Sequence, residues 1–221
     1  MDNTKKVLIY DSRSAQFKEV DAATVRPEET VMNLPAEEPG QALKKTTEAL
    51  HRTDIEHFRT QQKMPVVVVL DNIRSLNNIG SIFRTCDGFA CSRIVLCGIT
   101  ATPPSPEIHK TALGAELSMG WEYVPSTREA VEKLRDEGYT IVCLGQVHGS
   151  VALQKFRPAP DAKYALIVGN EVDGVDPAIV AGADLYLEIP QSGTKHSLNV
   201  AVATAVTLWE FYRNSDIIGE V

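Results

Sequence analysis

Long apolar runs are absent from this sequence of 221 residues, and no stretch approaches the roughly 18 consecutive apolar residues that a membrane-spanning helix needs. The first residues, MDNTKKVLIYDSRS, also lack the apolar segment and the small-residue cleavage site of a secretory signal. We therefore expect a protein that works in the cytoplasm and has no membrane partner.

Positive charge is scarce as well. The chain has 22 Lys and Arg residues against 29 Asp and Glu residues, which gives a formal net charge of −7 at pH 7. A protein that coats nucleic acid through its bulk charge needs the opposite balance. If this chain binds nucleic acid, a local basic cleft must supply the contacts.

Cysteine is limited to four residues, Cys86, Cys91, Cys97 and Cys143. Their spacing matches neither paired zinc-binding motifs nor a dense disulfide framework, so no metal site is predicted. We expect Cys86, Cys97 and Cys143 to be small buried hydrophobic residues, because they lie in apolar segments. Cys91 is expected in a turn.

Three widespread catalytic patterns are also missing. The absence of GxGxxG weakens a conventional Rossmann interpretation, and no Gly-Lys-Ser/Thr follows Gly174 as a P-loop requires. The chain has no GxSxG nucleophile elbow, and the adjacent His196 and Ser197 do not form a catalytic pair by adjacency alone.

From residue 65 onward the sequence alternates between strand-like and helix-like segments. Strands are predicted at 65–71, 92–98, 120–125, 139–146, 164–170 and 184–190. Helices are predicted at 78–89, 109–118, 127–138, 176–183 and from 198 to about 212, with Thr127, Asp176 and Ser197 as N-caps. This alternation predicts an α/β fold, a mostly parallel sheet with helices on both faces. The last helix is apolar nearly all round, so we expect it to be buried or to lie in a subunit interface.

Residues 1–63 differ in composition from the rest. A short strand is predicted at 5–11, an acidic loop containing prolines at 23–41, and a helix with a thin apolar stripe at 41–62. We find no catalytic pattern there. The chain is therefore divided into an N-terminal extension of unassigned role, 1–63, and a main domain, 64–221.

Candidate functional residues follow the strands, because ligands of open parallel sheets bind outside the carboxyl ends of the strands. In residues 71–85, Asn77, Gly80 and Arg84 share a helix face, and the glycine leaves space toward which Arg84 leans. A guanidinium placed there suits a phosphate or carboxylate ligand. A surface salt bridge for Arg84 and a plain helix cap for Asn78 explain the same residues.

Two further loops are unusual. The strand at 164–170 ends in Gly169, Asn170 and Glu171, where the glycine allows close approach of another molecule or serves a simple turn. After Ile189 and Pro190, a polar loop containing glycine leads into the last apolar helix.

Together and in this order, these three stretches resemble the SpoU/TrmH-like RNA 2′-O-ribose methyltransferases of the SPOUT superfamily. The motif N-x-G-x-x-x-R is similar to Asn78 through Arg84, the motif Gly-x-Glu to Gly169–Glu171, and the third motif to Ile189-Pro190 followed by Ser197-Leu198-Asn199-Val200. The resemblance covers roughly residues 65–213. Residues 1–63 lie outside it.

The resemblance implies S-adenosylmethionine as the cofactor, a deep C-terminal trefoil knot, tRNA or rRNA as the substrate, and a homodimer with the active site at its interface. The knot would involve the segments around 143–147, 166–175 and 187–199. By the same resemblance, the cofactor would contact a set of residues at the strand ends: Leu144, Gly169, Asn170, Ile189, Pro190, Ser197 and Leu198.

The resemblance also assigns catalysis to Arg84, Asn78, Glu171, Ser197 and Asn199. We expect Arg84 to bind a phosphate and orient the ribose 2′-hydroxyl, because a guanidinium normally stays protonated and is a poor base. The residues expected to contact RNA are Arg74, His109, Lys110, Lys195 and His196. A catalytically inactive RNA-binding protein and a SPOUT enzyme that methylates a base are the alternatives.

Overall fold

A computed structural model describes residues 6–11, 16–21, 31–32 and 53–217. The chain divides into two compact units, Met1–Arg52 and Thr53–Val221. In the first unit, β1 (Lys6–Asp11) pairs antiparallel with β2 (Gln16–Asp21) and with β3 (Val31–Met32). Of the helix predicted at 41–62, only α1 (Ile55–Thr60) falls in the described residues, and the part before residue 53 lies outside them.

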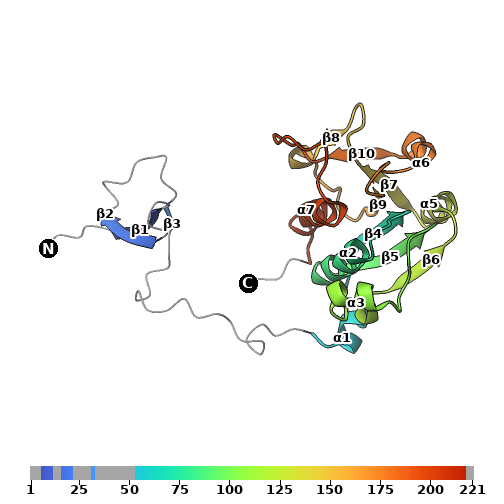
Figure 1. Cartoon of the computed structure of the whole chain (residues 1–221), viewed down its shortest axis with the longest axis horizontal. Coiled ribbons are helices and arrows are strands. Elements are labelled where there is room, and N and C mark those ends of the chain that lie inside the picture. Colours follow the sequence, from blue (N-terminus) through green and yellow to red (C-terminus); the bar gives the residue numbers. More distant parts are fainter. Residues whose placement is uncertain (1–5, 12–15, 22–30, 33–52, 218–221) are drawn as a thin grey trace. The chain divides into compact units, whose positions relative to one another are not determined.

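The second unit contains a sheet of seven strands in the order β6-β5-β4-β9-β7-β10-β8 (Figure 1). The strands are β4 (Met64–Asp71), β5 (Cys91–Cys97), β6 (Trp121–Val124), β7 (Tyr139–Leu144), β8 (Val151–Ala152), β9 (Lys163–Gly169) and β10 (Leu185–Glu188). Every pairing between neighbours in this sheet is parallel. The carboxyl ends of all seven strands therefore lie at one edge.

Helices cover both faces of the sheet, which confirms the predicted α/β architecture. The helices are α2 (Leu76–Gly88), α3 (Pro106–Ala112), α4 (Ala115–Ser118), α5 (Thr127–Asp136), α6 (Pro177–Gly182) and α7 (Val200–Tyr212), with a 3₁₀ turn, η3, at Leu153–Lys155. In Figure 1, α2, α3 and α7 lie on one side of the sheet and α5 and α6 on the other. Even-numbered residues of β4 face the first group and Val67 and Val69 face the second, so β4 is buried on both sides.

Several predicted helix boundaries were wrong. The Thr127 side chain does not cap α5. It lies in the first turn of α5 and donates a hydrogen bond to Asp71 (2.6 Å), while Ser126 occupies the cap position. The helix predicted at 109–118 is split into α3 and α4, because Leu113 and Gly114 adopt left-handed backbone conformations. The turn predicted at Cys91 was also wrong. Cys91 is the first residue of β5, and it is buried like the other three cysteines.

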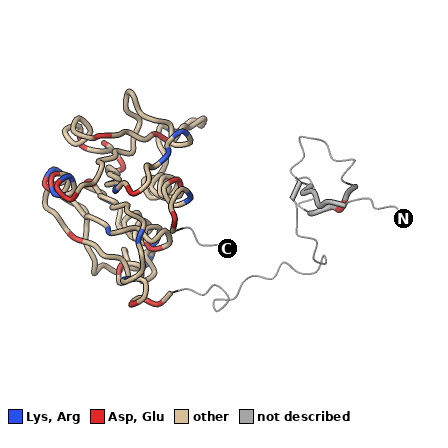
Figure 2. The backbone as a smooth tube through the Cα atoms, turned by 180° about the vertical axis from the view of Figure 1, so that it is seen from behind, with Lys and Arg blue, Asp and Glu red and all other residues tan. Residues whose placement is uncertain are grey.

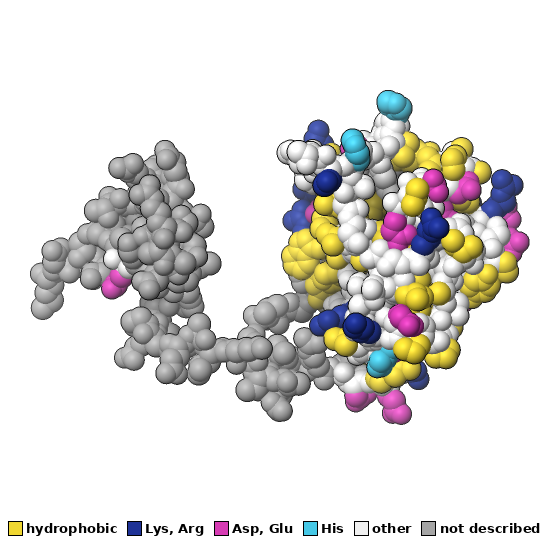
Figure 3. Space-filling model, viewed as in Figure 1, with side chains coloured by type: hydrophobic (Ala, Val, Ile, Leu, Met, Phe, Trp, Pro, Cys, Tyr) yellow, Lys and Arg dark blue, Asp and Glu magenta, His cyan; other side chains and the backbone are white. Residues whose placement is uncertain are grey.

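The last helix, α7, has an unusual distribution of polarity. Val202, Val206 and Trp209 are 50%, 41% and 48% exposed and project from one side of it, and Figure 3 shows hydrophobic side chains gathered over this helix. The other side is buried, and it includes the polar residues Thr204 and Thr207. The helix is therefore not buried all round within one chain.

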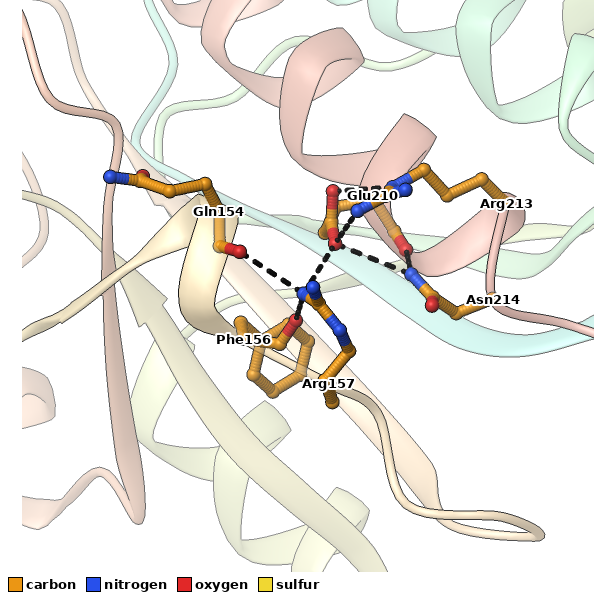
Figure 4. Close-up of polar contacts among 6 residues, drawn as sticks. All are labelled: Gln154, Phe156, Arg157, Glu210, Arg213 and Asn214. Carbon is orange, nitrogen blue, oxygen red and sulfur yellow. Dashed lines mark hydrogen bonds and ion pairs between the residues drawn. The ribbon is translucent and has the colours of Figure 1, made fainter.

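Glu210, near the end of α7, is buried and well paired (Figure 4). Its carboxylate accepts hydrogen bonds from Nε and Nη2 of Arg213, each at 2.7 Å, and pairs with Nη1 of Arg157 at 3.3 Å. The Arg157 guanidinium also donates to the carbonyl oxygens of Gln154 and Phe156. This cluster fastens the segment after η3 to the end of α7.

Basic and acidic residues are interspersed along the described chain, as on α5 (Figure 2). No helix among the described residues is long and apolar enough to cross a membrane. In the same part of the chain, no three His, Cys, Asp or Glu side chains are grouped closely enough to hold a metal ion.

Candidate functional site

A cavity of about 460 Å³ opens at the carboxyl ends of β7, β9 and β10, three neighbouring strands of the sheet. This is the edge at which ligands of open parallel sheets bind. Six of the seven residues predicted to contact a cofactor line it: Leu144, Gly169, Asn170, Ile189, Ser197 and Leu198. Pro190 is exposed beside the cavity and is not part of its lining.

The loop after β9 forms a tight turn that shapes one wall. The backbone groups of Asn170 and Gly174 exchange two hydrogen bonds of 3.1 Å, and the Asn170 side-chain oxygen accepts from the backbone N–H groups of Val172 and Asp173. A Cβ added at Gly169 would collide with the backbone of Gly174 and Val175. The glycine is therefore required for the loop to fold back on itself, so the simple-turn interpretation holds.

The buried carboxylate of Asp71, at the end of β4, is hydrogen-bonded to the end of the loop after β9. Its Oδ2 accepts from the backbone N–H of Asp176 (2.8 Å), and its Oδ1 accepts from Thr127 Oγ1 and from Asn72 Nδ2. The three donors belong to α5, to the loop after β4 and to the start of α6. Asp71 therefore ties the base of the cavity wall to the sheet.

Three predicted catalytic residues form a chain of two hydrogen bonds with Asn78 in the middle. Glu171 accepts from Asn78 Nδ2 (2.8 Å), and Asn78 Oδ1 accepts from Asn199 Nδ2 (3.1 Å). We call this chain of Glu171, Asn78 and Asn199 the amide relay. It joins the loop after β9, helix α2 and the start of α7, which are far apart in the sequence.

The Glu171 carboxylate also closes the loop before α2, because it accepts from the backbone N–H groups of Arg74 (3.2 Å) and Ser75 (3.1 Å). Partial burial raises the pKa of Glu171. The hydrogen bonds from Asn78 and the two backbone groups outweigh that effect and leave its pKa below the ordinary value of 4.5. Glu171 is therefore held in its ionised form.

The predicted cap of the last helix was wrong: Asn199, and not Ser197, caps α7. The Asn199 Oδ1 accepts from the backbone N–H groups of Ala201 (2.9 Å) and Val202 (3.3 Å). Its Nδ2 remains free to donate to Asn78. Ser197 lies two residues outside the cap, where it lines the cavity.

The predicted role of Gly80 in making room for Arg84 is also wrong. A Cβ at Gly80 would collide with Thr111 Oγ1 and the carbonyl oxygen of Ile108, because α3 packs directly against this glycine. Arg84 is exposed on α2 and does not line the cavity. It lies six residues beyond Asn78, about 9 Å farther along the helix axis.

The five predicted RNA-contacting residues are exposed but do not form one cluster. His196 lines the cavity and Lys195 lies next to it on the same loop. Arg74 is adjacent to the amide relay through its backbone. His109 and Lys110 lie on α3, where His109 pairs with the buried Glu116. That contact lowers the pKa of Glu116 although burial raises it.

Sequence reasoning missed four polar residues that line the cavity, Gln146, Asp173, Glu188 and Gln191. Gln146 Nε2 donates to the carbonyl oxygen of His196 (2.8 Å), and Ser150 Oγ donates to Glu188 Oε2 (2.8 Å). Glu188 could have been found from its position, because it ends a strand immediately before Ile189 and Pro190.

The lining fits a nucleoside cofactor. The side chains of Leu144, Val168, Ile189 and Leu198 form apolar walls suited to the flat face of a base. A Cβ added at Gly145, which also lines the cavity, would meet no atom within 4 Å, so a ligand can approach this backbone closely. Polar side chains at the rim can bind the hydroxyl and charged groups of such a ligand.

Comparison with known proteins identifies the class. The model of the SpoU rRNA Methylase family matches residues 65–209. The chain belongs to this family, and the resemblance inferred from the three motifs is confirmed.

The relatives agree with this assignment. A putative TrmH family tRNA/rRNA methyltransferase of Staphylococcus haemolyticus is 25% identical over 198 residues, which cover 88% of this chain and 78% of the relative. The structure of an AdoMet-bound rRNA methyltransferase from Sinorhizobium meliloti is 29% identical with a TM-score of 0.65, over 73% of this chain and 61% of that one. A TrmH/SpoU tRNA modifying enzyme of A. aeolicus is 28% identical with a TM-score of 0.63, over 72% and 79%. The match thus spans about three fifths of the length of the Sinorhizobium protein.

Proposed function

We propose that this chain transfers a methyl group from S-adenosylmethionine to a ribose 2′-hydroxyl of tRNA or rRNA in the cytoplasm. The family and its AdoMet-bound relatives support methyl transfer and this cofactor. The amide relay carries the proposal further, because it holds the three motif loops together at the cavity. The division into an N-terminal extension, 1–63, and a methyltransferase domain, 64–221, is part of the same proposal.

The cofactor pocket is the cavity at the ends of β7, β9 and β10. Leu144, Ile189 and Leu198 would enclose the base, and Gly169, Asn170, Pro190 and Ser197 would bind or shape the edge of the site. S-adenosylmethionine supplies a methyl group that its sulfonium has already activated. The main task of the protein residues is therefore to align the acceptor hydroxyl, and alignment lowers a barrier by several kcal/mol.

The acceptor side of the site is assigned to Arg84, with Asn78, Glu171, Ser197 and Asn199 holding the geometry. Because Arg84 is exposed and does not line the cavity of its own chain, we propose that it serves the cavity of a second subunit. Helices α2 and α7 contact each other, and the exposed stripe of Val202, Val206 and Trp209 lies on α7. Apolar stripes of this kind mark protein interfaces. The stripe is the proposed homodimer interface.

The trefoil knot belongs to the same proposal. It would involve the segments around 143–147, 166–175 and 187–199, which contribute most of the cavity lining. RNA would lie over Arg74, Lys195 and His196 beside the cavity, and over His109 and Lys110 on α3. Because the net charge is acidic, this contact must be local. If it is made to RNA phosphates, RNA binding should weaken as the salt concentration rises.

Incubating the full chain with methyl-labelled S-adenosylmethionine and RNA from cells that lack the protein tests the reaction. After digestion to nucleosides, mass spectrometry places the label on the sugar or on the base. Label on the ribose is expected. Label on the base would overturn the ribose assignment, and no label on any RNA would favour an inactive RNA-binding protein.

Mixing two inactive variants tests the position of Arg84. Arg84→Ala should abolish methyl transfer while cofactor affinity is nearly unchanged, and Asn199→Ala should damage the cavity. If Arg84 acts across the interface, each mixed dimer has one intact site, and refolding the variants together restores roughly a quarter of the activity. If Arg84 acts within its own chain, the mixture stays inactive.

A further inference from the structure

Of the Asp, Glu, Lys and Arg side chains in the described chain, those that line the cofactor cavity are all acidic. Glu171, Asp173 and Glu188 line it, and none of the Lys and Arg residues among the described part of the chain does. S-adenosylmethionine and its product, S-adenosylhomocysteine, differ at one charged group: the first carries a sulfonium cation and the second a neutral thioether. A negative lining therefore favours the first ligand if the sulfonium lies close to it.

The three carboxylates are compensated to different degrees. Glu171 accepts three hydrogen bonds from Arg74, Ser75 and Asn78. Asp173 is exposed to water at the tip of its loop. Glu188 is half-buried at the end of β10, and no ion pair joins it to a basic residue of the described chain. Of the three, Glu188 is therefore the carboxylate that has neither several hydrogen-bond donors nor full exposure to water.

The one polar partner of Glu188 offsets little of this charge. Ser150 Oγ lies 2.8 Å from Glu188 Oε2 and 2.7 Å from the carbonyl oxygen of Val147. A hydroxyl has a single proton and can donate to only one of these two acceptors at a time. The serine therefore holds the carboxylate in place at the cavity without neutralising it.

We propose that Glu188 makes the cavity bind S-adenosylmethionine in preference to S-adenosylhomocysteine. A partly buried carboxylate attracts a nearby cation more strongly than one in bulk water, whereas a neutral thioether gains nothing from it. Glu188 is thus a residue that determines specificity between cofactor and product. This inference rests on the proposed function, because it requires the cavity to be the cofactor site.

Isothermal titration calorimetry of the full chain tests this inference without an activity assay. The variants are Glu188→Gln, whose amide oxygen can still accept from Ser150, and Glu132→Gln as a control. Glu132 is an exposed acid on α5 and does not line the cavity. The ligands are S-adenosylmethionine, S-adenosylhomocysteine and sinefungin, which carries an ammonium group in the region of the sulfonium.

The Glu188→Gln variant should bind S-adenosylmethionine and sinefungin roughly three- to tenfold more weakly, and less so at high salt. Its affinity for S-adenosylhomocysteine should be unchanged, and Glu132→Gln should match the unmodified chain with all three ligands. An equal loss for both cofactor and product, or no loss for either, would overturn the inference while the proposed function stands. If the unmodified chain binds none of the three ligands, the proposed function and the inference both fail.

Discussion

The helices α2 and α7 have the same length, 13 residues, and lie in contact on the same face of the sheet, yet their polar and apolar residues are distributed differently. α2 buries Ile79, Ile82 and Phe83 and exposes Arg84, as a surface helix of a globular protein does. α7 also buries apolar residues, but it exposes Val202 and Val206 and buries polar ones. The buried polar set is Thr204, Thr207 and Glu210.

The buried polar groups of α7 are satisfied locally. Thr204 and Thr207 donate to the carbonyl oxygens of Val200 and Ala203 four residues earlier, and Glu210 is paired with two arginines. Burying these groups therefore costs little, while Val202 and Val206 leave much of their apolar surface in water, as does Trp209 although it packs against Phe89 and Tyr212. The difference between the helices is that α2 buries its apolar face within its own chain, whereas α7 leaves an apolar stripe exposed, which is what the proposed dimer would cover.

The largest expected effect comes from a substitution that disrupts the packing of α2 against α3. Gly80→Ala should destabilise the fold by roughly 3 kcal/mol or more, because the new methyl group collides with Thr111 and with the α3 backbone at Ile108. Urea denaturation followed by circular dichroism measures the loss. Gly88→Ala is the matched control, since a Cβ at Gly88 meets nothing within 4 Å. Equal stability of the two variants would contradict the close packing.

The next effect concerns α7. Val206→Asp should abolish the proposed dimer and leave the monomer folded, because the carboxylate is solvated in one chain but buried in the pair. Light scattering after size exclusion measures the mass. The control is Leu117→Asp, which places the same charge on an exposed leucine of α4. A monomeric unmodified chain, or a dimer that survives the substitution, would count against the assignment of the stripe.

A smaller effect lies at the junction of the two helices. The pKa of Glu171 is below 4.5 in the folded chain, so its carboxylate stabilises the fold fully above about pH 4.5, and this contribution is lost as the pH falls through the folded-state pKa. Glu171→Gln should cost about 1 kcal/mol or less at pH 7, because the group is partly exposed and screened. The difference in stability between variant and parent, measured by denaturation curves, should be smaller at pH 3 than at pH 7. A pH-independent difference would show that ionisation is not involved.

The smallest expected effect concerns the buried cysteines, whose thiols should not react in the folded chain. Cys86 lies on the buried face of α2, and burial raises its pKa well above the ordinary value. Burial likewise raises the pKa of Cys97 and of Cys143 to about 12. Thiolate is the reactive form, so these thiols should resist Ellman's reagent at pH 8 until the chain is unfolded. Rapid labelling of Cys86 in the native chain would show that the buried face of α2 opens.

Much of the sheet could be predicted from the sequence, because strands buried on both faces read as continuous apolar runs, as in Val66–Leu70. The caps were harder. Ser197 and Asn199 are both good cap residues, and only the tertiary position of Asn78 shows that Asn199 is the one used. The exposed face of α7 could not be predicted either. Its buried face contains polar residues and its exposed face contains apolar ones, so the sequence shows no clear amphipathic pattern.

The site residues show the same limit. The motif loops were located correctly because they follow strands, and Leu144, Gly169 and Ile189 do line the cavity. The purpose of Gly80 was misread, because its neighbours, Ile108 and Thr111, lie about 30 residues farther along the chain. Glu188 was missed for lack of a motif. Its importance comes only from the sign of the charges around it.

Asn199 has one further consequence, because a single side chain holds two structures together. Its oxygen fixes the first turn of α7 and its nitrogen holds Asn78, which in turn holds Glu171. Neither the loop after β9 nor the start of α7 can move away from α2 without breaking a hydrogen bond of the amide relay. Entry and exit of a ligand should therefore require the segments joined by the amide relay to move together. Asn199 is the residue that couples their motion.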